Sequence, residues 1–400
     1  DKKFDFEKDP IETYVDQGWV KAKGTTLGAD NGMGVAAAMA VLTDPKVAHG
    51  PVEALFTVDE ETGMTGAKNL KKGVLKGEIL INMDSEDEGE LYVGCAGGID
   101  VGATNNYRQE KTPAGVTAYK LSLKGLKGGH SGLDIHLGKG NANKLMFRFF
   151  QQAEHDFGMR IADYSGGDLR NAIPRESFAT IIVPTIKKAQ FEKFMKGYEK
   201  MYRAEFKEVD PDIKFIFKVS EAPAKVMNEA DQYRLIRAVY VCPNGVQRMS
   251  ASMPGVVETS NNLSIVRIGN GKFESFCLCR SSVETAKEAT AWKIAAGFQL
   301  AGCDIELSGS YPGWKPNMDS AILVTMKDTY NKLYGKVPEI KAIHAGLECG
   351  IIMGVYPKLD SISFGPTIRY PHSPDEKVEI ASVGKFWDFL VATLKNAPKA

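Results

Sequence analysis

The sequence predicts an α/β domain that is interrupted by a large α+β insertion. Strands and helices alternate over the first hundred residues, as they do in an open α/β sheet. Longer amphipathic helices mixed with strands follow, in the proportion of an α+β domain with an antiparallel sheet. The first pattern returns after the turn-rich segment 309–316. A chain of 400 residues is also expected from its length to form two domains.

The interrupted domain is predicted to combine residues 1–104 with residues 313–400. Its expected elements are a helix after a glycine-rich loop (34–42), an apolar strand (53–58), a short helix (67–72), a second strand (79–83) and a terminal helix (380–394). In open sheets of this kind, ligands gather beyond the carboxyl ends of the strands. We therefore expect the functional groups of this domain there.

The insertion is predicted over residues 105–312. Its helices are expected over 141–157, 187–206 and 228–241, and its strands over 116–123, 178–183, 213–219, 263–268 and 273–279. Ile268–Lys272 joins the last two strands, and its Asn-Gly pair is typical of a tight hairpin turn. An antiparallel sheet is therefore expected in this domain.

The composition argues against several classes of protein. Lys and Arg together number 50, as do Asp and Glu, so no net field attracts nucleic acid or an anionic membrane. No apolar run approaches the roughly eighteen residues that a membrane span needs. The six cysteines are few and scattered, which argues against a disulfide framework and favours a reducing cytoplasm.

Four acidic or histidine-containing clusters each lie just past a predicted strand or at the start of a helix. They contain Asp30, Glu60 with Glu61, Asp84, and His372. Structural alternatives are a tight Asp-Asn-Gly turn for the first, solvated helix-start acids for the second and a loop histidine for the last. Together, the carboxylates and the imidazole form a ligand set that suits zinc, manganese or cobalt.

The residues after His372 also predict the start of a helix. Ser373 would be the N-cap, Pro374 the first helical residue and Glu376 the third position of a capping box. This interpretation explains the pattern structurally, but it gives no reason for the histidine that precedes it.

Seven motifs resemble those of the aminoacylase–carboxypeptidase–dipeptidase superfamily of di-metal hydrolases. They lie at Gly28–Gly34, Asp59–Gly63, Asn82–Glu86, Gly128–Gly132, Arg170–Pro174, His344–Glu348 and Pro371–Glu376, and so cover essentially the whole chain. The fourth, fifth and sixth favour the aminoacyl-histidine dipeptidases, which are carnosinase-like. The resemblance implies a di-metal peptidase catalytic domain and an inserted lid domain that covers the substrate.

The resemblance implies two divalent metal ions. Zinc is the expected metal, and manganese and cobalt are the alternatives. Asp30 would bridge the two ions, Glu61 and His372 would complete one site, and Asp84 would serve the other. Glu60 would be the general base for a water whose pKa the ions lower. The implied reaction is hydrolysis of dipeptides, in particular Xaa-His dipeptides such as β-alanyl-histidine.

The resemblance places four further residues at the substrate. His130 would stabilise the oxyanion, Arg280 would bind the substrate carboxylate through two N–H groups, and Asn171 and Glu348 would face the substrate. The residues alone leave open an exposed turn for His130, a solvated strand end for Arg280 and a turn cap for Asn171. In relatives this histidine comes in some cases from the other subunit of a dimer. A homodimer is therefore expected, and action of His130 within or between subunits stays open.

One family motif, a His-x-Asp before the bridging aspartate, does not occur in the sequence. No aspartate lies two positions after any of the six histidines, so one metal site is short of a ligand. Because the chain begins at Asp1 without a methionine or signal peptide, we expect an upstream segment that carries the motif. The alternatives are N-acyl-amino-acid deacylation, cleavage of other dipeptides, or an inactive metal-binding or interaction protein.

Overall fold

Residues 4–398 are described by the structure, a computed structural model, and the chain divides into two compact units. The first unit combines Asp1–Cys95 with Gly313–Ala400, and the second is Ala96–Pro312. The second boundary falls where the sequence places it. The first boundary lies nine residues earlier than expected, because one strand, β5 (Gly97–Asn106), runs through the expected position as an inner member of the second unit's large sheet.

The first unit contains a mixed four-stranded sheet in the order β18-β4-β19-β3. Its strands are β3 (Ile79–Asn82), β4 (Glu90–Cys95), β18 (Glu339–Ile343) and β19 (Asp360–Ser363). β18 runs parallel to β4 and β19 runs parallel to β3, whereas β19 and β4 are antiparallel. The helices of this unit are α1 (Ala29–Thr43), α2 (Glu60–Gly63), α3 (Thr65–Asn69), α8 (Ala321–Tyr334), α9 (Glu348–Val355) and α10 (Ile380–Asn396).

A second, antiparallel sheet of the first unit joins distant parts of the chain. Its order is β1-β2-β21-β20, over Thr13–Asp16, Trp19–Ala22, Lys377–Glu379 and Ile368–Arg369. Trp19 pairs with Glu379, and Lys21 pairs with Lys377. This pairing brings the loop before α1 next to the loop 370–376, two segments that lie about 340 residues apart in the sequence.

The second unit is built on a nine-stranded antiparallel sheet, as the sequence predicts for the insertion. Eight strands follow the order β12-β7-β11-β9-β15-β16-β5-β17, and β14 pairs with β15. Their bounds, in that order and omitting β5, are Lys214–Ser220, Val116–Lys124, Ser177–Pro184, Arg160–Gly166, Val257–Gly269, Lys272–Ser281, Asp304–Tyr311 and, for β14, Gly245–Met249. Two small sheets pair β8 (Gly129–His130) with β10 (Ala172–Ile173) and β6 (Gln109–Lys111) with β13 (Lys225–Met227).

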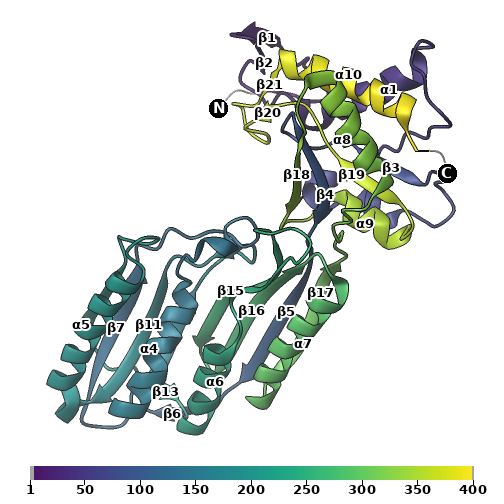
Figure 1. Ribbon diagram of the computed structural model, residues 1–400. Coiled ribbons are helices and arrows are strands. Elements are labelled where there is room, and N and C mark those ends of the chain that lie inside the picture. Colours follow the sequence, from purple (N-terminus) through teal and green to yellow (C-terminus); the bar gives the residue numbers. More distant parts are fainter. Residues whose placement is uncertain (1–3, 399–400) are drawn as a thin grey trace. The chain divides into compact units, whose positions relative to one another are not determined.

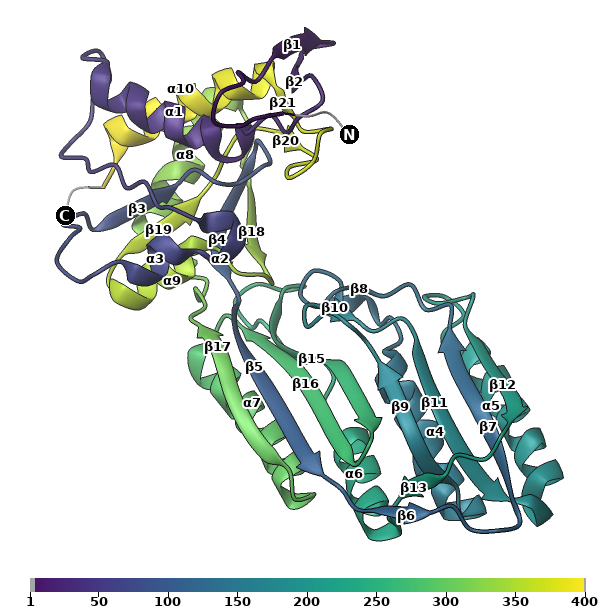
Figure 2. The same ribbon diagram turned by 180° about the vertical axis from the view of Figure 1, so that it is seen from behind.

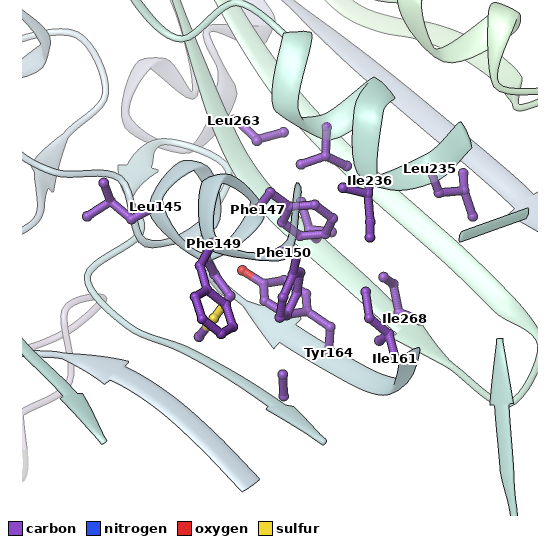
Figure 3. Close-up of a cluster of buried hydrophobic side chains, with 14 of the residues drawn as sticks. Leu145, Phe147, Phe149, Phe150, Ile161, Tyr164, Leu235, Ile236, Leu263 and Ile268 are labelled. Carbon is purple, nitrogen blue, oxygen red and sulfur yellow. The ribbon is translucent and has the colours of Figure 1, made fainter. Parts of the chain in front are cut away.

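Helices α4, α5, α6 and α7 cover one face of this large sheet, as Figures 1 and 2 show from opposite sides. They span Ala142–Phe157, Lys188–Glu205, Glu229–Val241 and Glu284–Leu300. Their apolar faces and the sheet form the main core of the unit, where aromatic rings of α4 such as Phe149 and Phe150 are fully buried (Figure 3). Burial of apolar surface on this scale is the dominant stabilising contribution to a fold.

One predicted strand of the first unit is wrong. Residues 53–58 form no strand, and the side chains of Phe56 and Val58 are 50% and 68% exposed. In the sheet order, β3 is one of the two edge strands, and no described strand pairs with its outer side. An apolar run becomes a strand only where a partner completes its hydrogen bonds, and the described residues offer residues 53–58 no such partner.

Candidate active site

Three of the predicted metal ligands meet in the first unit. Nε2 of His372 lies 2.9 Å from a carboxylate oxygen of Glu61 and 3.1 Å from one of Asp30. One donor atom from each residue lies within 4.8 Å of the others. Burial lowers the pKa of His372, but Glu61 and Asp30 outweigh this effect, so the pKa is raised overall. The cluster therefore offers two oxygens and one nitrogen to a common centre.

Asp30 is held in place by Glu376, whose side chain is almost completely buried. The N–H groups of Leu27 and Gly28 donate to one oxygen of Glu376, each at 2.8 Å, and the N–H of Asp30 donates to the other at 3.1 Å. Gly28, just before Asp30, has a φ of 75°, in the left-handed region that favours glycine. The carboxylate of Glu376 thus fixes the loop from which Asp30 projects.

The helix start predicted at Ser373 is therefore wrong. Residues 371–375 form turns, in which the N–H of Asp375 donates to Oγ of Ser373 at 3.2 Å. Glu376 does satisfy backbone N–H groups, as a capping residue does, but those of a loop nearly 350 residues earlier. Ser and Asp side chains often close turns in this way, so the local pattern alone does not distinguish a turn from a helix start.

Asp84 follows strand β3 and approaches the same place. The amino-terminal part of α1 packs closely on Met83, the residue before Asp84. A Cβ on Gly34 would lie 2.6 Å from the carbonyl oxygen of Met83. Burial, followed by the nearby charges of Asp30 and Glu60, raises the pKa of Asp84 to about 8. A nearby cation would favour the charged carboxylate and would lower this pKa.

The three consecutive carboxylates 59–61 have different environments. Asp59 adopts a left-handed backbone conformation and accepts hydrogen bonds from the hydroxyls of Thr62 and Thr65. Glu60 and Glu61 open the short helix α2. Burial and then the charge of Glu61 raise the pKa of Glu60 to about 7. Asp59 therefore belongs to the turn, and the two glutamates face the acidic cluster.

Glu348, at the start of α9, is the sixth acidic or histidine residue of this cluster. Its Oε2 accepts a hydrogen bond from the hydroxyl of Thr57 at 3.0 Å, whereas its buried Oε1 has no partner among the described residues. Burial raises its pKa, and its charge contributes to the raised pKa values of Glu60 and Asp84. A buried carboxylate oxygen without a partner is costly unless a ligand supplies one.

This donor set fits divalent cations. Five carboxylates gather around one imidazole, that of His372. It is the only basic group in the interactions described above. Close carboxylates repel one another, and that repulsion contributes to the raised pKa values of Asp84 and Glu60. Bound cations would remove the repulsion, and carboxylate with imidazole is a ligand combination that zinc and similar metals accept.

A second cluster lies in the second unit and contains His130. The N–H groups of Leu133 and Gly132 point at Nδ1 of His130, at 3.0 and 3.2 Å, so Nδ1 accepts and the ring proton is on Nε2. Burial and then Arg280 lower the pKa of His130, opposed by Asp134. The imidazole is thus a neutral donor with its Nε2–H fixed in direction.

Arg280 and Asn171 belong to the same cluster. Arg280 is 5% exposed, and its guanidinium donates to Oγ of Ser131 at 3.3 Å and to the hydroxyl of Tyr311 at 3.0 Å. The N–H of Ser131 in turn donates to the carbonyl oxygen of Asn171 at 2.8 Å. Asn171 itself is exposed. A short stretch of pairing between β8 and β10 holds the two motifs together.

The nine predicted site residues therefore fall into two clusters, one in each unit. Asp30, Glu60, Glu61, Asp84, Glu348 and His372 belong to the first, and His130, Asn171 and Arg280 to the second. Sequence reasoning missed the roles of Glu376, Ser131 and Tyr311. The sequence around Glu376 indicates a helix cap, and Tyr311 lies in a segment that carries only a turn signal.

Comparison with known proteins finds a matching family and a similar protein. The model of a peptidase family, M20/M25/M40, matches residues 3–396. The chain is 46% identical over 396 residues to the cytosol non-specific dipeptidase of Escherichia coli (strain K12), a match that spans 98% of this chain and 81% of the relative.

Solved structures are similar as well. The aminoacylhistidine dipeptidase of Vibrio alginolyticus matches with a TM-score of 0.97 and 48% identity, over 100% of this chain and 82% of that one. The aminopeptidase PepT of Bacillus cereus, 17% identical with a TM-score of 0.52 over 97% of this chain and 77% of that one, shares the fold. Among the described residues, no helix is both long and apolar enough to cross a membrane.

Proposed function

The chain belongs to peptidase family M20/M25/M40, and from that membership we propose that it hydrolyses Xaa-His dipeptides such as β-alanyl-histidine. The observation that carries the proposal is the convergence of Asp30, Glu61 and His372. It occurs in a chain 48% identical to an aminoacylhistidine dipeptidase. The E. coli relative is named a non-specific dipeptidase, which favours a wider dipeptide range as the second candidate.

Dipeptidases of this family are generally di-metal enzymes, and the acidic cluster supports two divalent ions here. Asp30 would bridge the ions, Glu61 and His372 would hold one, and Asp84 would hold the other. Zinc is the first candidate, with manganese or cobalt as alternatives. When bound, the ions would supply Lewis acidity and lower the pKa of water.

Glu60 is proposed as the general base. Burial and neighbouring carboxylates raise its pKa to about 7, and cations bound beside it would lower that pKa, so a carboxylate able to accept a proton would be present at neutral pH. One carboxylate oxygen would take a proton from the water that attacks the carbonyl carbon. The same proton would then pass to the amide nitrogen, so that the C–N bond breaks with a neutral amine as the leaving group.

The remaining residues are proposed to orient the dipeptide. The fixed Nε2–H of His130 is suited to donate to the developing oxyanion, because a neutral imidazole needs no rearrangement to do so. Arg280 would bind the substrate's terminal carboxylate, and Asn171 would contact the substrate beside it. The unpartnered oxygen of Glu348 would accept from the substrate's ammonium group.

Steady-state kinetics on the metal-loaded, full-length enzyme tests the proposal. We expect turnover of β-alanyl-histidine and glycyl-histidine and none of N-acetyl amino acids. Preference for N-acetyl amino acids would show a deacylase instead. Absence of turnover on every substrate, with metal bound, would favour the inactive metal-binding alternative.

We also propose a homodimer and a cytoplasmic location. All six cysteines are buried and free, as a reducing compartment favours, and the E. coli relative is named a cytosol enzyme.

Mixing His130→Ala with Glu60→Gln decides which subunit supplies His130. If it acts across the dimer, activity returns, because hybrid dimers contain one complete set of groups. If it acts within its own chain, none returns.

A further inference from the structure

We propose that Tyr311 is a second donor to the terminal carboxylate of the substrate, beside Arg280, and that it sets the preference for a free carboxylate. The inference rests on the proposed function, in which Arg280 binds that carboxylate. Neither motif analysis nor the chain's similarity to other proteins assigns Tyr311 a role. Its position at the end of β17 and its contact with Arg280 point to one.

Arg280 is a buried cation whose hydrogen-bonding capacity is only partly used. Nε donates to Oγ of Ser131 and Nη1 donates to the hydroxyl of Tyr311, but Nη2 has no acceptor among the described residues. No described carboxylate lies within ion-pair distance of this guanidinium. A buried charge without a counter-charge is strongly unfavourable, so an anionic ligand is expected beside it.

The charges around Arg280 support an anion. Asp100, the acid whose pKa responds to Arg280, already pairs with Arg170. After burial, Arg280 also lowers the pKa of His130, which favours the neutral imidazole. Two guanidinium groups and one carboxylate leave an excess of one positive charge, which matches the single negative charge of a dipeptide's carboxylate.

The hydroxyl of Tyr311 has a hydrogen to donate. A guanidinium can only donate, so the phenolic oxygen is the acceptor in its bond with Arg280 and its own hydrogen stays free. No described residue accepts that hydrogen. Because the phenolic oxygen lies 3.0 Å from Nη1, an anion bound at the end of the guanidinium also lies beside the phenol.

Tyr311 is also fixed in position, as a pre-organised donor must be. The fully buried Lys287 donates from Nζ to the carbonyl oxygen of Tyr311 at 2.7 Å and is paired with Glu284. On the neighbouring strand β5, Gly98 pairs with Tyr311, and a Cβ there would lie 2.6 Å from its ring. The ring therefore packs directly against the backbone of β5, at a position where only glycine fits.

Calorimetric titration of the full chain with two non-hydrolysable dipeptide analogues tests the proposal. Both have the peptide bond reduced to CH₂–NH; one keeps the terminal carboxylate, and the other has CH₂OH in its place. We expect Tyr311→Phe to raise the Kd of the carboxylate analogue about tenfold or more, the usual effect of losing a hydrogen bond to a charged group. The Kd of the alcohol analogue should change less than about twofold.

Tyr198→Phe is the matched control, because its hydroxyl donates to Gln152 between α4 and α5. It should leave both Kd values unchanged. An unchanged Kd for the carboxylate analogue with Tyr311→Phe, or an equal rise for both analogues, would overturn the role of Tyr311. A wild-type chain that does not prefer the carboxylate analogue would instead overturn the proposed binding of a carboxylate by Arg280.

Discussion

Glu60 and Glu61 are neighbours in the sequence, yet their side chains take different positions in the acidic cluster. Only Glu61 brings an oxygen within 2.9 Å of Nε2 of His372, whereas Glu60 has a pKa raised to about 7 by burial and surrounding charge. A ligand must remain a carboxylate, while a base must take up and release a proton. The two environments therefore support different roles for these two residues.

We predict that Glu60→Gln in the full-length protein abolishes turnover but leaves two metal ions bound, because the amide keeps the shape of the side chain and cannot take a proton. Glu61→Gln should instead weaken metal binding, since it replaces a charged ligand with a neutral one. Metal content by atomic absorption after dialysis distinguishes the two variants. Loss of metal from the Glu60 variant but not from the Glu61 variant would reverse the assignment.

Glu376 provides the second prediction at this scale. Its carboxylate accepts hydrogen bonds from three backbone N–H groups of the loop that carries Asp30. Glu376→Gln should therefore displace Asp30 without removing any of the proposed metal ligands. We expect metal affinity, measured by calorimetry, to fall about 10- to 100-fold, as it does when groups that orient ligands are lost.

Asp360→Asn is the matched control for Glu376→Gln. Asp360 also accepts a backbone N–H, that of Ile322 at 3.0 Å, together with the hydroxyl of Ser320, at the start of α8. It should lower thermal stability while leaving metal affinity unchanged. Equal losses of metal affinity in both variants would show that Glu376 acts only on stability.

At the scale of elements, the sequence predicts well where amphipathic pattern and end signals agree. The predicted helices over 141–157, 187–206 and 228–241 are present as α4, α5 and α6, because each buries one apolar face and two of them begin with an asparagine cap. The hairpin at Asn270-Gly271 is also present, with φ of 51° and 78° at its two turn residues.

Two kinds of element could not be predicted from the sequence. Strand β5 is rich in glycine and carries no alternating pattern, and pairing with β16 and β17 on its two sides defines it. The reverse holds for residues 53–58, which carry a strand pattern but form no strand. In both cases distant partners decide the structure, and the local pattern contains no information about them.

The open edge of β3 leads to a prediction about a further strand. α1 exposes Val35, Met39 and Leu42 at the spacing of one helical stripe, and residues 53–58 also expose large apolar side chains. Large apolar side chains exposed on one face of an element often mark a surface that another part of a protein covers. We predict that a strand ending in His-x-Asp pairs beside β3 and supplies the missing metal ligand. The coding sequence upstream of Asp1 tests this.

Hydrogen exchange gives a second measurement of the same prediction. In a chain that includes the predicted strand, the amides of one edge of β3 should become protected relative to the 400-residue chain, because they gain partners. A protein that hydrolyses dipeptides from a reading frame without any His-x-Asp would contradict the prediction.

For the whole molecule, the chemistry divides between the two units. The sequence predicts the site residues through motifs that resemble those of a family, but it does not reveal how they group. In the structure, the acidic cluster gathers the segments 27–30, 59–61 and 370–376 with Asp84 and Glu348, whereas the second cluster joins β8, β10 and β16. Glu376 and Tyr311 escape prediction because their partners are distant in sequence.

This division predicts that metal binding and carboxylate binding can be changed independently. Arg280 makes its hydrogen bonds to Ser131 and Tyr311, and Glu376 makes its own to the loop 27–30, so the two share no partner. Effects of substitutions at sites without shared partners normally add.

Arg280→Lys should raise KM for dipeptides about 10- to 100-fold, because an ammonium cannot reproduce the paired donors of a guanidinium. It should leave the affinity for metal unchanged, and the double variant Arg280→Lys/Glu376→Gln should have the metal affinity of Glu376→Gln alone. Calorimetric metal titrations of the three variants, together with KM values, measure both effects. If Arg280→Lys by itself lowered metal affinity, the cluster of the second unit would take part in holding the ions, and the proposed division between the units would be wrong.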